Sequence, residues 1–154
     1  MRRLVLATVL ALALPAFAHA GALASLSAGE VPALLKPPTR GVRILAVWAL
    51  DCAFCEANMR SLAKLQRAHP REVELVTVAT DSIARHKEIT ARLKAMQMDG
   101  YPAHAYAEAS PERLDYLLDP DWGGETPRTE LIRADGSRRG ISGELTEAQL
   151  HGLL

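Results

Sequence analysis

Two cysteines, Cys52 and Cys55, are the only cysteines in the chain, and two residues, Ala53 and Phe54, separate them. A disulfide across so short a gap closes almost no loop, so it would add little to the stability of a fold. Two thiols at this spacing can form and break a disulfide reversibly by thiol-disulfide exchange. The pair therefore indicates redox chemistry rather than structural cross-linking.

A predicted strand and a predicted helix flank the cysteine pair. Residues 42–48 are apolar and β-branched, which is typical of a buried strand. Residues 56–69 have helical spacing, and the apolar face of that helix carries Cys55. Cys52 then falls at the helix start, where the positive end of the helix dipole favours a thiolate. We therefore expect an exposed, ionisable sulfur on Cys52 and a shielded sulfur on Cys55.

Two carboxylates, Asp51 and Glu56, adjoin the cysteine pair in the sequence. A negative charge near a thiolate disfavours that thiolate, so these residues are expected to raise the pKa of Cys52 and to oppose the helix dipole. A strong oxidant needs a strongly stabilised thiolate. The acidic setting therefore favours a reductant of substrate disulfides over an oxidant.

The first twenty residues have the pattern of an export signal. Met1-Arg2-Arg3 is basic, residues 4–14 are apolar except for one threonine, and Ala18-His19-Ala20 has small residues at both ends. We predict a signal peptide over residues 1–20, cleaved after Ala20, with a competing site after Ala18. The apolar run is shorter than the about 20 residues that a bilayer crossing needs, and an uncleaved anchor is the alternative. The mature protein is then expected to be periplasmic or secreted.

The composition narrows the choice of partners. The 154 residues suit one domain with a hydrophobic core of its own. Basic and acidic residues are equal in number, 18 each, and no basic stripe alternates with aromatic residues, so no nucleic-acid partner is expected. A structural zinc site needs four ligands, and no second cysteine pair or ordered histidine pair completes one. We therefore expect no metal.

The rest of the chain reads as alternating strands and helices, which indicates an α/β fold. Residues 21–40 are expected to be a lead-in with a short helical turn near residues 31–36. The elements expected after residue 69 are a strand at 73–79, a helix from Asp81 or Ser82 to 98, a short strand or link at 103–107, a helix at 111–118, a loop at 121–125, a hairpin of 127–132 with 138–142, and a closing helix from Thr146 to 154.

With these elements in place, the chain resembles exported thiol-disulfide oxidoreductases of the TlpA and ResA type. The run from Trp48 to Cys55 stands where that family has Trp-Ala-x-Trp-Cys-x-x-Cys, and Thr126-Pro127 stands where it has a residue followed by a cis-proline. The turn Asp135-Gly136 and the run Gly143-Glu144-Leu145 match its terminal hairpin and the approach to its last helix. The resemblance implies a thioredoxin-like domain over residues 41–154: an α/β three-layer sandwich in which helices flank a central mixed β-sheet.

The resemblance also implies roles for individual residues. Cys52 is expected to be the nucleophile and Cys55 the resolving thiol. Pro127 lacks an N–H group, so the backbone of Thr126 is expected to be free to pair with a substrate peptide. Ala53 and Phe54 complete the expected substrate-binding residues, because Phe54 should face solvent beside the exposed sulfur and form an apolar rim.

Three residues depart from the family pattern. Asp51 replaces the usual aromatic residue before the first cysteine, Phe54 replaces a common proline, and Ala46 stands where many members have a buried polar or acidic residue. The departures concern the redox potential and the natural partner rather than the basic chemistry.

The sequence therefore predicts a periplasmic reductase of protein disulfides, in cytochrome maturation or in disulfide repair. No nicotinamide or flavin motif is present, so we expect no cofactor beyond the Cys52–Cys55 disulfide and a membrane thiol-disulfide carrier as electron donor. One alternative is a copper-delivery module in which both sulfurs bind Cu(I). Another is a non-catalytic adaptor of the same fold. The sequence leaves the oligomeric state open.

Five further side chains need an interpretation. Met96 and Met98, with His104 nearby, invite a copper site, but methionines late in an amphipathic helix more often fill a core. Trp122, in a polar loop, is expected either to extend the substrate rim or to fix the loop. Trp48, which ends an apolar strand, is expected in the core.

Overall fold

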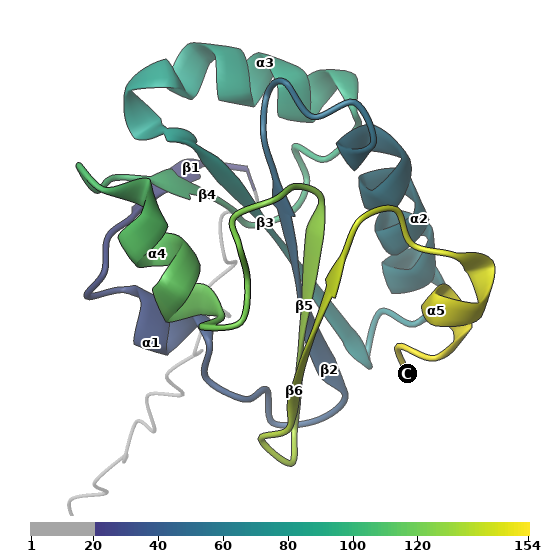
Figure 1. Cartoon of the computed structure of the whole chain (residues 1–154). Helices are drawn as coiled ribbons and strands as arrows, with labels where there is room; N and C mark the ends of the chain where they lie inside the picture. Colours follow the sequence, from purple (N-terminus) through teal and green to yellow (C-terminus); the bar gives the residue numbers. More distant parts are fainter. Residues whose placement is uncertain (1–20) are drawn as a thin grey trace, which may run out of the picture.

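The computed structural model describes residues 21–154, and the predicted signal peptide lies outside them. Helices cover both faces of one six-stranded sheet (Figure 1). In chain order the elements are β1 (Leu23–Leu26), α1 (Val31–Leu34), β2 (Val42–Trp48), α2 (Cys55–Ala68), β3 (Val73–Ser82), the 3₁₀ helix η1 (Ile83–Arg85), α3 (His86–Ala95), β4 (Ala103–Tyr106), α4 (Pro111–Leu118), β5 (Arg128–Arg133), β6 (Arg138–Ser142) and α5 (Glu147–His151).

The sheet is mixed, as expected. Its strand order is β1-β4-β3-β2-β5-β6, in which the first four strands are parallel and the last two run antiparallel to their neighbours. The central strands β2 and β3 are apolar almost throughout, because helices bury both faces of a parallel pair. The expected α/β class, with helices on both sides of a central mixed sheet, is confirmed.

Strand β2 supplies side chains to two cores, one on each face of the sheet. Ile44 and Trp48 face the core under α2 and α3, whereas Leu45 and Val47 face the core under α1 and α4. This alternation is the two-residue period of a strand. The helix pairs α1–α4 and α2–α5 therefore lie on opposite sides of β2, as Figure 1 shows.

Three stretches differ from the sequence expectation. The closing helix, expected to reach residue 154, ends at His151. Residues 23–26, expected to be part of an irregular lead-in, form strand β1, which pairs with β4 at the edge of the sheet. A four-residue strand has too little local pattern to be recognised, because its stability comes from the distant partner. The helix expected from residue 81 or 82 to 98 is also shorter: β3 continues to Ser82, α3 ends at Ala95, and Gln97 has a positive φ of 59°.

Other expectations are confirmed. The ambiguous segment at residues 103–107 contains strand β4, and the return strand of the hairpin has its expected bounds, Arg138–Ser142. Thr146 caps α5 in a capping box with Gln149, whose side chain accepts from the Thr146 N–H at 2.9 Å. No helix in residues 21–154 is long and apolar enough to cross a membrane.

Candidate redox site

Cys52 and Cys55 form a disulfide, with their Cα atoms 5.5 Å apart. Cys52 is half-buried and Cys55 is only 2% exposed. The expected order of exposure, with one accessible sulfur and one shielded sulfur, is confirmed. An incoming thiolate or disulfide can therefore reach Cys52 but not Cys55.

The position of Cys52 relative to the helix needs correction. Helix α2 begins at Cys55, with Phe54 as its N-cap residue, so Cys52 precedes the helix instead of lying in its first turn. The Cys52 N–H donates to the carbonyl of Ala49 at 3.2 Å, which closes a turn between β2 and α2. The unpaired N–H groups at the start of α2 still face this turn, since the first N–H groups of a helix point out of its N-terminal end.

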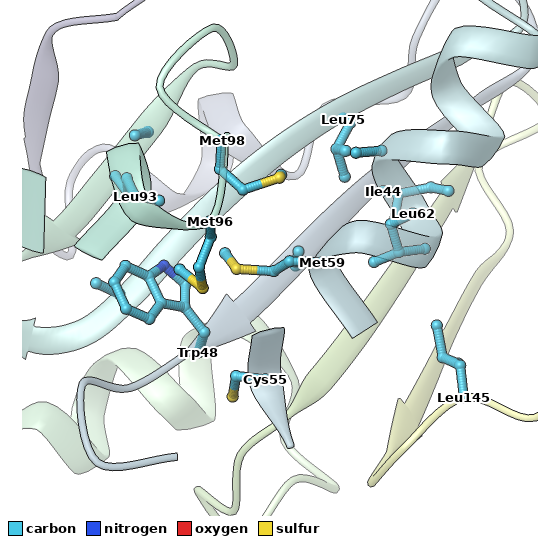
Figure 2. Close-up of a cluster of buried hydrophobic side chains, with 14 of the residues drawn as sticks. Ile44, Trp48, Cys55, Met59, Leu62, Leu75, Leu93, Met96, Met98 and Leu145 are labelled. Carbon is cyan, nitrogen blue, oxygen red and sulfur yellow. The ribbon is translucent and has the colours of Figure 1, made fainter. Parts of the chain in front are cut away.

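Figure 2 shows the buried side chains around Cys55. Cys55 lies at one end of an apolar cluster that includes Trp48, Met59, Met96 and Met98, all at most 2% exposed. Trp48 is therefore a core side chain, as expected. Met96 and Met98 also lie in the core, so of their two interpretations, copper ligand and core side chain, the second is the one that the structure supports.

His104 is half-buried on β4, and burial lowers its pKa. Its Nδ1 atom is buried without a hydrogen-bond partner. Residues 21–154 contain no group of three or more histidine, cysteine, aspartate and glutamate side chains placed to hold a metal ion.

The acidic residues beside the cysteines differ in their surroundings. Glu56 accepts from Arg60 at 2.6 Å and lies 3.4 Å from Arg92, so two cations offset its charge. Asp51 is exposed, and in the described part of the chain it forms no ion pair within 4.0 Å. Of the two carboxylates expected to disfavour a thiolate, Asp51 is therefore the one without a contact ion pair, although Arg85 lies close enough to attract it electrostatically.

Asp81, at the end of β3, stabilises the turn that carries the cysteines. Its carboxylate accepts from the Leu50 N–H at 2.8 Å and pairs with Arg85 at 2.7 Å. We expected Asp81 only as a possible start of the following helix. The contact joins residues 31 positions apart, so no local pattern in the sequence indicates it.

The β2–β5 pairing brings the Thr126-Pro127 segment to the cysteine end of the sheet. Val47 pairs with Arg128, so Pro127 follows the same antiparallel register toward the end of β2 from which the cysteine turn leaves. The Thr126–Pro127 peptide bond is cis, as the resemblance implies. Thr126 is half-buried and Pro127 is buried. Their role in binding substrate stays a prediction.

Phe54 and Ala53 form the exposed tip of the cysteine turn. Phe54 is 59% exposed, which confirms that it faces solvent, and Ala53 is also exposed. Their role as a rim for substrate stays a prediction. Trp122 is instead buried, and its Nε1–H donates to the carbonyl of Glu125 at 2.8 Å. Of its two interpretations, fixing the loop is the one that the structure supports.

Asn58 is a residue of the site that we did not predict. Its side-chain amide donates to the carbonyl of Gly143 at 3.0 Å, and its oxygen accepts from the Leu145 N–H at 2.8 Å. The Gly143 N–H donates in turn to the carbonyl of Pro127 at 2.8 Å. Asn58 therefore connects the helix that begins at Cys55 with the segment that holds Pro127. The sequence contained one hint of this role: Asn58 is a polar residue directly before Met59, which belongs to the apolar face of the helix.

A buried ionic cluster adjoins Pro127 on the other side, and it too was missed. Arg128 is 8% exposed and Glu130 is 1% exposed, and the Arg128 Nε atom lies 2.6 Å from Glu130 Oε1. The Arg128 Nη2 atom also pairs with Asp119, which precedes the loop leading to Thr126. The sequence contained one hint of this pair: Arg128 and Glu130 carry opposite charges and, being two positions apart in a strand, lie on the same face.

No family model and no curated protein matches the sequence. Solved structures do match. A thioredoxin-related protein from Neisseria meningitidis serogroup B is 27% identical, with a TM-score of 0.58 over 75% of this chain and 84% of that chain. A secreted Mycobacterium tuberculosis disulfide oxidoreductase homologous to E. coli DsbE is 19% identical, with a TM-score of 0.55 over 74% and 81% of the two chains. StoA from Bacillus subtilis is 20% identical, with a TM-score of 0.54 over 76% and 84%.

These neighbours and the sheet order define the class of protein. The chain has the thioredoxin-like α/β fold, its structural neighbours include thiol-disulfide oxidoreductases, and it carries a Cys-x-x-Cys pair whose second cysteine begins α2. The resemblance inferred from the cysteine, cis-proline and hairpin motifs is therefore confirmed.

Proposed function

We propose that this protein is a periplasmic thiol-disulfide oxidoreductase that reduces disulfides in other proteins. One observation carries the proposal: a half-exposed Cys52 is bonded to a buried Cys55 at the end of the sheet where Thr126 and Pro127 also lie. The fold shared with disulfide oxidoreductases supports the same chemistry.

The reaction starts from the reduced dithiol. The Cys52 thiolate attacks one sulfur of a substrate disulfide, which forms a mixed disulfide and releases one substrate thiolate. The Cys55 thiolate then attacks Cys52, which re-forms the Cys52–Cys55 bond and releases the second substrate thiolate. Two electrons pass from the dithiol to the substrate, and the leaving thiolates take up the protons that the two cysteine thiols lost.

The substrate peptide binds beside the cysteine turn. The backbone of Thr126 pairs with it as an added strand, because Pro127 contributes no N–H group of its own. Phe54 and Ala53 supply the apolar rim on the opposite side, which their exposure supports. This arrangement selects an extended segment around a cysteine rather than a particular sequence.

The direction and the location of the reaction are part of the proposal. Exposed Asp51 precedes Cys52 directly and disfavours its thiolate, which supports reduction over oxidation. The export-signal pattern of residues 1–20 supports a periplasmic location, and so does the secreted M. tuberculosis neighbour. A membrane dithiol carrier supplies the electrons, and cytochrome maturation or disulfide repair consumes them.

The first experiment measures insulin reduction with dithiothreitol as the electron source. We expect the protein to accelerate insulin precipitation and the Cys52→Ser variant to be inactive, whereas Ser61→Ala, on the same helix, stays active. No acceleration by the wild-type protein would contradict the proposal and favour a non-catalytic adaptor. Tight Cu(I) binding that Cys52→Ser abolishes would favour copper delivery.

The second experiment determines the direction by equilibration with glutathione buffers. We expect a reduction potential below about −180 mV, the region of isomerases and reductants. A potential near about −120 mV, that of a strong periplasmic oxidant, would overturn the reductant direction while leaving the oxidoreductase class intact.

A further inference from the structure

Arg128 makes polar contacts to three different segments of the chain. Its guanidinium bonds to Glu130 on its own strand at 2.6 Å, to Ser142 at the end of β6 at 2.6 Å, and to Asp119 at the end of α4. The guanidinium fork therefore uses nitrogen atoms in different directions, which a lysine ammonium cannot reproduce with the same geometry.

Strand β6 leaves room for this side chain. A Cβ atom at Gly140 would overlap the Arg128 guanidinium and the Glu130 carboxylate. Any larger residue at this position would therefore displace the cluster. The absence of a side chain at Gly140 is what lets the guanidinium lie against the backbone of β6.

The contacts of Arg128 continue into the loop that leads to Thr126 and Pro127. The Ser142 hydroxyl accepts from Arg128 and donates to the Glu125 carboxylate. At the other end of the loop, Asp119 accepts from Arg128 and also from the Asp121 N–H at 3.0 Å. The Arg128 guanidinium therefore binds both ends of the 119–125 loop. It contacts Asp119 directly and Glu125 through the Ser142 hydroxyl.

The Arg128 guanidinium balances the negative charge of the cluster. One cation faces two carboxylates, of which Glu130 is buried and Asp119 is partly exposed, and burial raises the pKa of Glu130 to about 7 despite the nearby Arg128. Burial also acts on Asp119, but hydrogen bonds from Asp121, Glu130 and Arg128 outweigh it and hold its pKa below the usual value. Without Arg128, two carboxylates would lie together with no cation between them, and the loop would lose the contact that holds it.

We propose that Arg128 is a positioning residue for the disulfide exchange: it fixes the 119–125 loop and, through it, the Thr126-Pro127 edge on which the substrate peptide binds. This inference rests on the proposed function. Arg128 does not contact the sulfurs, so it acts on substrate binding and not on the intrinsic reactivity of Cys52.

The experiment compares Arg128→Met with Arg113→Met, which removes an exposed arginine from α4. Steady-state insulin reduction reports KM and kcat, and iodoacetamide alkylation of the reduced protein reports the reactivity of Cys52. We expect Arg128→Met to raise KM about tenfold with alkylation unchanged within about twofold, and Arg128→Lys to recover part of the loss. Arg113→Met should match the wild type.

Two results would overturn the inference. One is an unchanged KM in a folded Arg128→Met variant, and the other is a fall in the alkylation rate as large as the rise in KM. If Arg128→Met does not fold, Ser142→Ala decides, because it breaks the link from Arg128 to Glu125 and leaves the bonds of Arg128 to Glu130 and Asp119 in place. A rise in its KM of about threefold supports the inference, and an unchanged KM contradicts it.

Hydrogen exchange separates this inference from the proposed function. The amides of residues 121–126 should exchange faster in Arg128→Met than in Arg113→Met, whether or not insulin is a substrate. If the wild-type protein fails to reduce insulin but this difference is present, the proposed function fails, and only the fixing of the 119–125 loop by Arg128 stands. Equal exchange in the two variants would refute the positioning role itself.

Discussion

The two sides of the candidate site use charge in different ways. On the cysteine side, Glu56 and its partners Arg60 and Arg92 are between one-third and two-thirds exposed. On the proline side, Arg128 and Glu130 are almost completely buried. Exposed ion pairs contribute little because water screens them, whereas removing one partner of a buried pair leaves an uncompensated charge.

This difference assigns different tasks to the two sides: the cysteine side determines the reactivity of a sulfur, and the proline side fixes the position of the substrate-binding edge. The cysteine side needs a solvent-exposed sulfur whose surroundings adjust its chemistry only slightly. The proline side needs a loop and a strand edge held in one place, and buried charges with several hydrogen bonds do that. Asn58 is the contact between the two sides, since it bonds to the segment that holds Pro127 and lies one turn after Cys55.

The largest effect is expected from Asn58→Ala, which breaks the connection between the two sides. The change leaves the buried Leu145 N–H and the Gly143 carbonyl without their partner, at a cost of about 3 kcal/mol in the free energy of unfolding. Urea denaturation of the oxidised protein measures it. Lys64→Ala, at an exposed position of α2, is the control and should change stability by less than about 0.5 kcal/mol. A similarly small loss for Asn58→Ala would mean that the two sides are not coupled through this residue.

A smaller effect is expected from Glu130→Gln, and it depends on pH. Burial raises the pKa of Glu130 from 4.5 to about 7, so between these values the folded protein retains a proton that the unfolded chain has lost. Stability contributed by the protonated form is therefore present below pH 4.5 and is lost as the pH rises through about 7. The free energy of unfolding of the wild type should fall by roughly 2 kcal/mol over this range because of Glu130.

Glu130→Gln should lack that fall, and urea denaturation at several pH values from 5 to 8 measures the difference. The groups around Glu130 are Arg128, Asp119, Asp121 and the β6 arginines Arg138 and Arg139, all of which the variant retains. The exposed Glu144→Gln serves as the matched control. Parallel stability curves for the wild type and Glu130→Gln would contradict the assignment.

The smallest effect is expected from Glu56→Gln on the cysteine side. Because Arg60 and Arg92 already offset the Glu56 charge, its removal should change the alkylation rate of reduced Cys52 by less than about threefold. Asp51→Asn, which removes the acid that has no contact ion pair, should increase the fraction of Cys52 thiolate at neutral pH more than Glu56→Gln does. The reverse order would show that exposure and ion pairing do not determine which acid acts on Cys52.

The sequence was most informative where structure depends on neighbouring residues. The apolar run of β2, the helical face that carries Cys55 and the cap at Thr146 follow from residues close together in the chain. Strand β1 and the bonds of Asn58 could not be predicted in this way, because their partners lie 80 or more positions away. The importance of Thr126-Pro127 came only from the family resemblance, since a proline at the start of a strand is ordinary.

Arg128 and Glu130 show another limit of sequence reasoning. Charged residues in a strand are usually placed on a solvated face. Strand β5 is nonetheless buried along almost its whole length, because β6, α4 and the 119–125 loop surround it. The two charges compensate each other within one strand, and that pairing permits their burial.

The central claim is that Cys52 is the attacking sulfur and Cys55 the resolving one. The most direct test mixes reduced Cys55→Ala with two peptides joined by one intermolecular disulfide and analyses the products by mass spectrometry without reductant. We predict a stable adduct of protein and one of the two peptides, attached to Cys52 and released by dithiothreitol. An adduct that forms on Cys55 in Cys52→Ala, with none on Cys52 in Cys55→Ala, would contradict the claim.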